Sequence, residues 1–284
     1  MKFENIRVYN FEHALRGMRN PKNSWHLSDS KFGMTYDENI LDYAREVAQS
    51  WTDSWVAQAE NVDERDKIAV NEDHINWLMD NGILKHDDGI DEYAFIGPKD
   101  MKLAKALIAG GSEHRKFLRQ IMVTVDITAP LYWWKEFDTY KVGTVANSTS
   151  TMHKLTSKPI TLDCFEIDDY DPHDLDIPLD GMDGTMVEVD ALIHVIIDGC
   201  ENLRKKYLET NDKRYWKELV RWLPEGWLQT RTVTMTYENL LSMRHQREHH
   251  KLTEWSGTGY DVVTPTFIKF AQTLPYSSDF IFCK

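Results

Sequence analysis

The segment that decides the fold is 121-IMVTVDITAPLYWWKEF-137, in which a strand pattern gives way to a helix pattern. Apolar and polar residues alternate from Ile121 to Ile127, which predicts a β-strand covered on one face. Pro130 then suits the first turn of an α-helix, and Thr128 is the expected N-cap of that helix. The segment therefore predicts a strand that leads directly into an aromatic helix.

Helical spacing dominates the rest of the chain. A short strand and a helical turn are expected within residues 3–18, and 234–255 is the last well-patterned segment. We predict further helices, with Asp37 as the N-cap of the first, over residues 38–60, 71–83, 101–109, 185–209 and 212–222. Gly110-Gly111 is expected to end the helix 101–109. Because helices are many and strands few, we predict an α+β fold with mixed helices around a small antiparallel sheet.

Composition excludes several classes of protein. The chain has 284 residues, of which 42% are hydrophobic, so it can bury a substantial core. Acidic residues outnumber basic ones by 46 to 33, and the formal charge of −13 argues against a nucleic-acid polymer as partner. The N-terminal segment lacks signal-peptide features and no window has the apolar length of a membrane span. We therefore expect a cytoplasmic protein without a membrane partner.

The cysteines and the acidic segment do not define a metal site. Cys164, Cys200 and Cys283 are far apart and form no pattern of metal ligands. Residues 163–190 contain eleven acidic residues, and we interpret them as a solvated surface loop. The alternative is a calcium loop, but the spacing in 174-DLDIPLDGMDG-184 does not match the pattern of known calcium loops.

A run of eleven uncharged residues, 142-VGTVANSTSTM-152, follows Lys141. Gly143 allows the chain to leave the preceding helix. The run then supplies short hydroxyl and amide side chains: Thr144, Asn147, Ser148, Thr149, Ser150 and Thr151. These groups donate directional hydrogen bonds without adding negative charge, so they suit a phosphate or the edge of a base. The alternative is a turn rich in Ser and Thr that caps a helix.

The cluster 244-RHQREHH-250 permits three interpretations. His245, Glu248 and His249 spell H-x-x-E-H, a zinc-peptidase pattern for which Glu254 is a candidate third ligand. Arg244 and neighbouring cations could instead bind an anion. The third interpretation is a solvated polar helix face. His114 is a further candidate for lining a pocket.

Three segments occur in the order found in the flavin-dependent thymidylate synthases. The strand 121-IMVTVDITAP-130 resembles the family's strand that ends in an Ala-Pro pair. The window 139-TYKVGTVANSTST-151 stands where the family has the signature R-H-R-x-x-S-x-N-x-x-S-x-R. The third segment, 239-NLLSMR-244, resembles the family's N-F-L-x-L-R. The resemblance covers roughly residues 100–255.

The signature itself is degraded in this chain. Two arginines and a histidine correspond to Thr139, Tyr140 and Lys141, and the last arginine corresponds to Thr151. Thr144 and Thr149 replace the two serines, Ala146 replaces the asparagine beside Asn147, and Met235 replaces an arginine that contacts flavin. Loss of bidentate arginine contacts weakens anion binding. A non-catalytic nucleotide-binding relative is therefore the alternative to an enzyme.

The resemblance implies a homotetramer that binds FAD and methylates dUMP or a close variant. Methylenetetrahydrofolate would donate the carbon and NADPH would reduce the flavin. We expect a core at 100–284 with an insertion at 163–190. We also expect an N-terminal strand and helical extension at 1–99, outside the resemblance, that packs on this core.

The resemblance assigns roles to individual residues. Arg244 would be catalytic and bind the nucleotide. The other nucleotide-binding residues would be Thr144, Asn147, Ser148, Thr149 and Ser150. The cofactor-binding residues would be Glu136, Tyr140, Lys141, His114, Asn239, His249 and His250. No metal ligand is assigned.

Overall fold

The computed structural model describes residues 1–36, 40–57, 59, 62–81, 83–84, 90–167, 178–180, 186–257 and 265–283. The chain forms two compact units. Unit 1 comprises Met1–Asn5, Val125–Val233 and His249–Phe267, and unit 2 comprises Ile6–Thr124, Thr234–Glu248 and Ile268–Lys284. Because the units are interleaved along the chain, neither corresponds to residues 1–99 alone, and the domain boundary at residue 99 stays a prediction.

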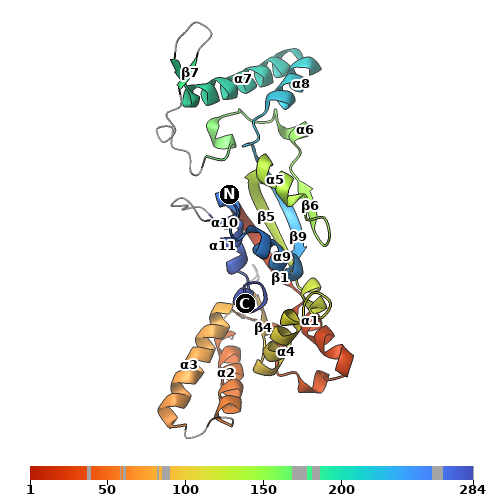
Figure 1. Ribbon diagram of the computed structural model, residues 1–284, viewed down its shortest axis with the longest axis vertical. Coiled ribbons are helices and arrows are strands. Elements are labelled where there is room, and N and C mark those ends of the chain that lie inside the picture. The colour runs from red at the N-terminus through yellow and green to blue at the C-terminus, as the bar shows by residue number, and fades with distance from the viewer. Residues whose placement is uncertain are drawn as a thin grey trace. The chain divides into compact units, whose positions relative to one another are not determined.

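A four-stranded sheet contains the strand of the segment 121–137 (Figure 1). Its strands are β1 (Lys2–Tyr9), β5 (Met122–Pro130), β9 (Leu228–Thr236) and β6 (Val145–Ser148), and they lie in the order β1-β5-β9-β6. The strand β5 confirms the predicted strand and runs three residues beyond it. The strand β6 lies at the edge of the sheet and all four of its residues are exposed.

Hydroxyl pairs show that β5 and β9 are antiparallel. Thr124 Oγ1 lies 3.3 Å from Thr234 Oγ1, and Thr128 Oγ1 lies 2.7 Å from Thr230 Oγ1, so residue numbers rise along one strand as they fall along the other. The prediction that Thr128 caps a helix is therefore wrong, because its hydroxyl is paired within the sheet. The N-cap of the helix that follows is Pro130.

A second sheet has three antiparallel strands in the order β2-β4-β3. These strands are β2 (Lys31–Tyr36), β3 (Ile83–Leu84) and β4 (Ile90–Phe95). A two-stranded hairpin, β7 (Pro178–Asp180) and β8 (Met186–Glu188), lies within the acidic segment. The interpretation of that segment as a loop is thus wrong at the hairpin. Residues 168–177 and 181–185, which hold most of the calcium-loop alternative, lie outside the described residues.

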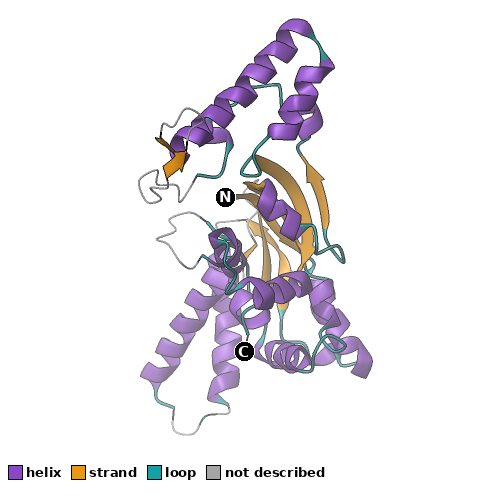
Figure 2. Ribbon diagram, turned by 45° about the horizontal axis from the view of Figure 1, so that its top comes forward, coloured by secondary structure: helices purple, strands orange, loops and turns teal. Residues whose placement is uncertain are grey.

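The helices agree with the mixed α+β prediction. They are α1 (Phe11–Arg19), α2 (Ile40–Val56), α3 (Glu64–Asn81), α4 (Pro98–Ala109), α5 (Leu131–Phe137), α6 (Thr151–Lys154), α7 (Val189–Thr210), α8 (Lys213–Trp222), α9 (Tyr237–Arg247), α10 (Thr253–Ser256), α11 (Phe267–Gln272) and α12 (Ser277–Phe280). Two pairs, α2 with α3 and α7 with α8, run side by side (Figures 1 and 2). None of the described helices is both long and apolar enough to cross a membrane.

Helix boundaries deviate from the predictions at the start of α3 and at the end of α5. Helix α3 begins at Glu64, seven residues before the predicted start. Helix α5 ends at Phe137, so Gly143, which has a φ of 80°, lies in the following loop and does not end the helix. Gly110 is the C-cap of α4, as predicted. The predicted N-cap Asp37 lies outside the described residues.

Aromatic side chains form the core of each unit. In unit 1, the ring of Trp133 stacks on that of Trp255 at 4.4 Å between centroids and on that of Phe137 at 5.2 Å. In unit 2, Phe11 packs edge-on against Tyr237 and Tyr276, each at 5.7 Å. Trp133 lies just after β5 and Tyr237 is the first residue of α9, so these aromatic contacts hold both elements in place.

Candidate functional site

The hydroxyl run forms a fixed backbone at the edge of the four-stranded sheet. The N–H of Thr149 donates to the carbonyl of Thr230 at 2.9 Å. The side-chain amide of Gln229 donates to the carbonyl of Thr149 at 2.8 Å. Both backbone polar groups of Thr149 are thus satisfied, and its side chain is held at a defined position on an exposed strand end.

Two hydroxyls of the run have local structural roles. The hydroxyl of Thr144 donates to the carbonyl of Tyr140. Ser150 Oγ accepts a hydrogen bond from the N–H of His153 at 3.1 Å and caps α6. The turn-and-cap alternative therefore holds for these two residues, and neither hydroxyl is free to bind a ligand without breaking a local contact.

The side chains of Asn147, Ser148 and Thr149, unlike those of Thr144 and Ser150, are not used in local hydrogen bonds. All three residues are exposed, and within the described part of the chain their side chains have no hydrogen-bond partner. Lys141, the cation that directly precedes the run, is exposed as well. These residues present neutral donors beside a positive charge, which is a chemistry that suits a phosphate.

Glu136 and His250, two predicted cofactor ligands, bind each other. His250 Nε2 lies 3.2 Å from Glu136 Oε2. The N–H of Leu252 donates to His250 Nδ1 at 3.2 Å, so the neutral imidazole carries its proton on Nε2 and directs it to the carboxylate. Both ring nitrogens are engaged, and the pair connects α5 to the segment before α10.

Arg231 belongs to the same unit and was not predicted as a site residue. Its guanidinium lies 4.2 Å from the centroid of the Trp134 ring, and its Nη1 donates to Asp138 Oδ1 at 2.7 Å. Its Nε donates to the side-chain oxygen of Gln229 at 3.0 Å. The sequence signal that could have identified it is the adjacent pair Thr230-Arg231.

Asn239 has a structural role at the start of α9. Its Oδ1 accepts from the N–H of Thr236 at 3.0 Å, and its own N–H donates to Thr236 Oγ1 at 3.2 Å. These reciprocal bonds form a capping box. A cofactor would have to compete with this cap for the amide oxygen of Asn239.

Arg244 lies half-buried near the end of α9. Its Nη2 donates to Glu248 Oε1 at 3.2 Å, and its Nη1 lies 3.2 Å from His245 Nδ1. Its Nε is buried 3.1 Å from Glu248 Oε2 and makes no aligned hydrogen bond. Its guanidinium lies 5.6 Å from the centroid of the Phe282 ring. The guanidinium is thus positioned while retaining unused donor capacity.

The remaining predicted cofactor residues are exposed or partly exposed. His114 and His249 are exposed, and Tyr140 is half-buried with its ring 6.3 Å from that of Trp255. The predicted residues fall into both units. His114, Asn239 and Arg244 belong to unit 2, and the others belong to unit 1.

The zinc interpretation finds no support in the geometry. Helix α9 ends at Arg247, before the second histidine of the H-x-x-E-H pattern. The Glu248 carboxylate, which would activate water, is bound by Arg244. Among the described residues, no group of three or more His, Cys, Asp or Glu side chains is placed to hold a metal ion.

The chain is similar to two solved structures of the flavin-dependent thymidylate synthase ThyX from Helicobacter pylori, both with FAD and dUMP. The first is 16% identical with a TM-score of 0.43 and covers 69% of this chain and 84% of that chain. The second is 14% identical with a TM-score of 0.44 and covers 90% and 97%. No protein-family model and no curated protein matches. Identities and TM-scores this low assign neither a fold nor an activity to this chain.

Proposed function

We propose that this chain is a divergent flavin-dependent thymidylate synthase-like enzyme. It methylates dUMP or a closely related pyrimidine deoxynucleotide, with FAD as cofactor and with methylenetetrahydrofolate and NADPH as co-substrates. The observation that carries the proposal is the set of unpaired, exposed donors at Asn147, Ser148 and Thr149. They occur at the position of the family signature within three correctly ordered segments.

Within this set of donors, Asn147 and Thr149 are two residues apart along the strand, so their side chains share a face and bind the nucleotide phosphate. The Asn147 amide and the Thr149 hydroxyl donate to its oxygens, and Lys141 supplies the positive charge. The backbone bonds at Thr149 hold the strand end in place before the ligand arrives, so little conformational entropy is lost on binding. Thr144 and Ser150 support this segment through the turn and the cap.

Arg244 binds and polarises the pyrimidine. Glu248 holds one side of the guanidinium, which limits its rotamers. Nη1 and Nη2 carry two N–H groups each, and the N–H groups that Glu248 and His245 leave unused suit a pyrimidine carbonyl oxygen. Arginine also stays protonated throughout the physiological pH range, so it can stabilise negative charge that develops on the ring.

The predicted cofactor residues fit FAD only in part. FAD supplies the hydride chemistry when bound, and the chain binds and orients it. Tyr140 and Lys141 offer an aromatic ring and a cation for this purpose. Glu136 acts indirectly, because its carboxylate holds His250 in place. A cytoplasmic homotetramer is part of this proposal.

A second candidate function is nucleotide binding without catalysis. The observation that favours it is the absence of charge at Thr139, Tyr140 and Thr151, where the family signature has cations. Such a protein retains the phosphate donors but holds the flavin too weakly or too loosely for turnover.

Absorbance and isotope release distinguish the two candidates. The purified chain is mixed with FAD, desalted and scanned for a flavin spectrum, and tritium release from dUMP labelled at C5 is then measured with both co-substrates. Retained flavin with tritium release supports the enzyme. Binding of dUMP without tritium release supports the second candidate, and absence of dUMP binding refutes both.

A matched pair of variants tests the phosphate site. Asn147→Ala removes an unpaired side-chain amide from the proposed site and is expected to weaken dUMP binding about three- to tenfold, as for one lost hydrogen bond. Ser148→Ala removes an exposed hydroxyl from the opposite face of β6 and should leave the affinity unchanged. Equal affinities for both variants would contradict the assignment.

A further inference from the structure

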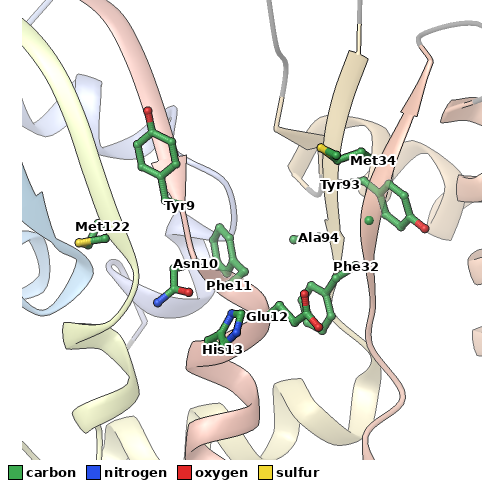
Figure 3. A pocket seen from close by; sticks show the side chains of 11 residues that line it. Tyr9, Asn10, Phe11, Glu12, His13, Phe32, Met34, Tyr93, Ala94 and Met122 are labelled. Atoms are coloured by element: carbon green, nitrogen blue, oxygen red, sulfur yellow. The ribbon is translucent and has the colours of Figure 1, made fainter.

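Unit 2 contains a cavity of about 620 Å³ that includes none of the proposed nucleotide or cofactor residues (Figure 3). Eleven residues line it, and they come from the end of β1, the first turn of α1, β2, β4 and the start of β5. Its volume lies within the range of roughly 300–1,000 Å³ that is typical of small-molecule sites.

Two apolar sides face each other across this cavity. Figure 3 shows Tyr9 and Met122 on one side and Phe32, Met34 and Tyr93 on the other. Tyr9 and Met122 are each 40% exposed, and Met34 is 69% exposed. Large apolar side chains gathered in the open around one cavity indicate a binding surface, because a chain without a ligand gains nothing by exposing them together.

Gly33 shapes one of these sides. It lies directly opposite Tyr93 in the β2–β4 register. A Cβ atom at this position would lie 2.8 Å from Tyr93 Oη and 2.9 Å from the ring, closer than real Cβ contacts. The absence of a side chain therefore lets the Tyr93 ring lie against β2, and this side of the cavity is formed before any ligand binds.

The floor of the cavity carries one carboxylate, that of Glu12. Figure 3 shows Glu12 and His13 between the two sides. Asn10 precedes them with a φ of 75°, and its side-chain amide donates to the carbonyl of Gln120 at 3.0 Å, which holds the first turn of α1. None of the eleven lining residues is lysine or arginine.

A second carboxylate, that of Glu46, lies near the Tyr93 side of the cavity. Burial raises the pKa of the Tyr93 hydroxyl, and the neighbouring Tyr43 and the Glu46 carboxylate raise it further. The whole chain carries a formal charge of −13. An anionic ligand would meet repulsion here, whereas a cation would meet both a carboxylate and the faces of aromatic rings.

We propose that this cavity binds a small organic cation, in which an amidinium, guanidinium or ammonium group is attached to an apolar body. The charged group bonds to the Glu12 carboxylate on the floor. The apolar body lies between Tyr9 on one side and Phe32 and Tyr93 on the other. Charge-assisted hydrogen bonds and cation–π contacts supply the selectivity for a cation over a neutral ligand of the same shape.

Benzamidine and its neutral analogue benzamide test this directly, because they share a shape and differ in charge. Binding to the full chain is measured by ligand-observed NMR and calorimetry. We expect benzamidine to bind at least tenfold more tightly than benzamide. Glu12→Gln is expected to weaken benzamidine binding about tenfold or more and to leave benzamide binding unchanged.

Two further variants complete the test. Glu4→Gln makes the same charge change on exposed β1 outside the cavity and should leave benzamidine binding unchanged. Met34→Lys places a cation in the cavity at an exposed position, so it should abolish benzamidine binding without unfolding the chain. The proposal is refuted if the wild-type chain does not prefer benzamidine, or if Glu12→Gln and Met34→Lys both bind it as the wild type does.

Discussion

Replacement of Asp100 by Asn should destabilise unit 2 strongly. Asp100 is fully buried in the first turn of α4, and Arg19 is only 5% exposed. The Asp100 carboxylate accepts hydrogen bonds from Arg19 Nε, from Ser28 Oγ at 2.5 Å and from Ser30 Oγ at 2.6 Å. Asn has nearly the same size, so the substitution removes the charge while leaving the packing volume almost unchanged.

The expected cost follows from the burial of both partners. Removing one partner of a buried ion pair costs about 3–5 kcal/mol, because the other charge stays buried without compensation. The pair Arg45–Asp42 also joins an arginine to an aspartate, with 3.0 Å between charged atoms, but its side chains are 58% and 70% exposed. An exposed pair contributes about 0–1 kcal/mol. Asp42→Asn is therefore the matched control and should cost less than about 1 kcal/mol.

Urea denaturation measures both variants. Far-UV circular dichroism and tryptophan fluorescence are recorded together, and coincident transitions establish that one unfolding free energy describes the change. If Asp100→Asn fails to fold, Ser28→Ala provides a milder change, with an expected loss of about 1.5–3 kcal/mol for one hydrogen bond to a charged group. The reasoning is refuted if Asp100→Asn costs no more than Asp42→Asn.

Three further outcomes are expected. Arg244→Lys keeps the charge but loses the planar donor geometry, and should weaken dUMP binding about tenfold or more in a calorimetric titration. Asn239→Ala removes the side-chain half of a capping box and should cost about 1 kcal/mol in urea denaturation. Hydrogen bonds from Arg204 lower the pKa of Glu201 from 4.5 to about 2. This stabilisation is complete above about pH 4.5 and is lost as the pH falls toward 2, so Glu201→Gln should reduce the acid sensitivity of the urea midpoint.

The elements that could be predicted are those with a local signal. Alternation in β5 is visible because Val123, Val125 and Ile127 are completely buried while the residues between them are not. Helix α8 was placed within a residue of its bounds, because Asp212 caps it and Pro224 follows soon after its end. Such signals are contained in a few neighbouring residues, so no tertiary information is needed to read them.

Elements without a local signal were missed or misplaced. The first turns of α3 are mostly charged, so an apolar stripe did not mark the true start at Glu64. The four residues of β6 are exposed on both faces and show no alternation of burial. The segment 234–255 was treated as one unit, although it contains the end of β9, α9 and α10. The order β1-β5-β9-β6 depends on pairing between distant residues, which no short window records.

The candidate site shows the same division between local and distant information. The composition of 142–152 identified a set of donors, and the alternatives were a ligand site or a turn that caps a helix. The structure assigns Ser150 to the second of these, because its oxygen accepts the N–H of His153 three residues later. Hydroxyl groups are chemically alike in a sequence, and only the position of the backbone decides which of them already have partners.

Under the proposed function, phosphate binding in this chain depends on neutral donors instead of arginines. A guanidinium contributes a full charge and two parallel donors, whereas a hydroxyl or amide contributes a dipole that acts only at short range. Neutral donors must therefore be held accurately in place, and the two backbone bonds at Thr149 provide that constraint. Neutral donors also avoid the mutual repulsion of several cations on the exposed edge strand β6. Selectivity at such a site arises from geometry more than from charge, which favours a ligand of fixed shape such as a mononucleotide over a flexible polyanion.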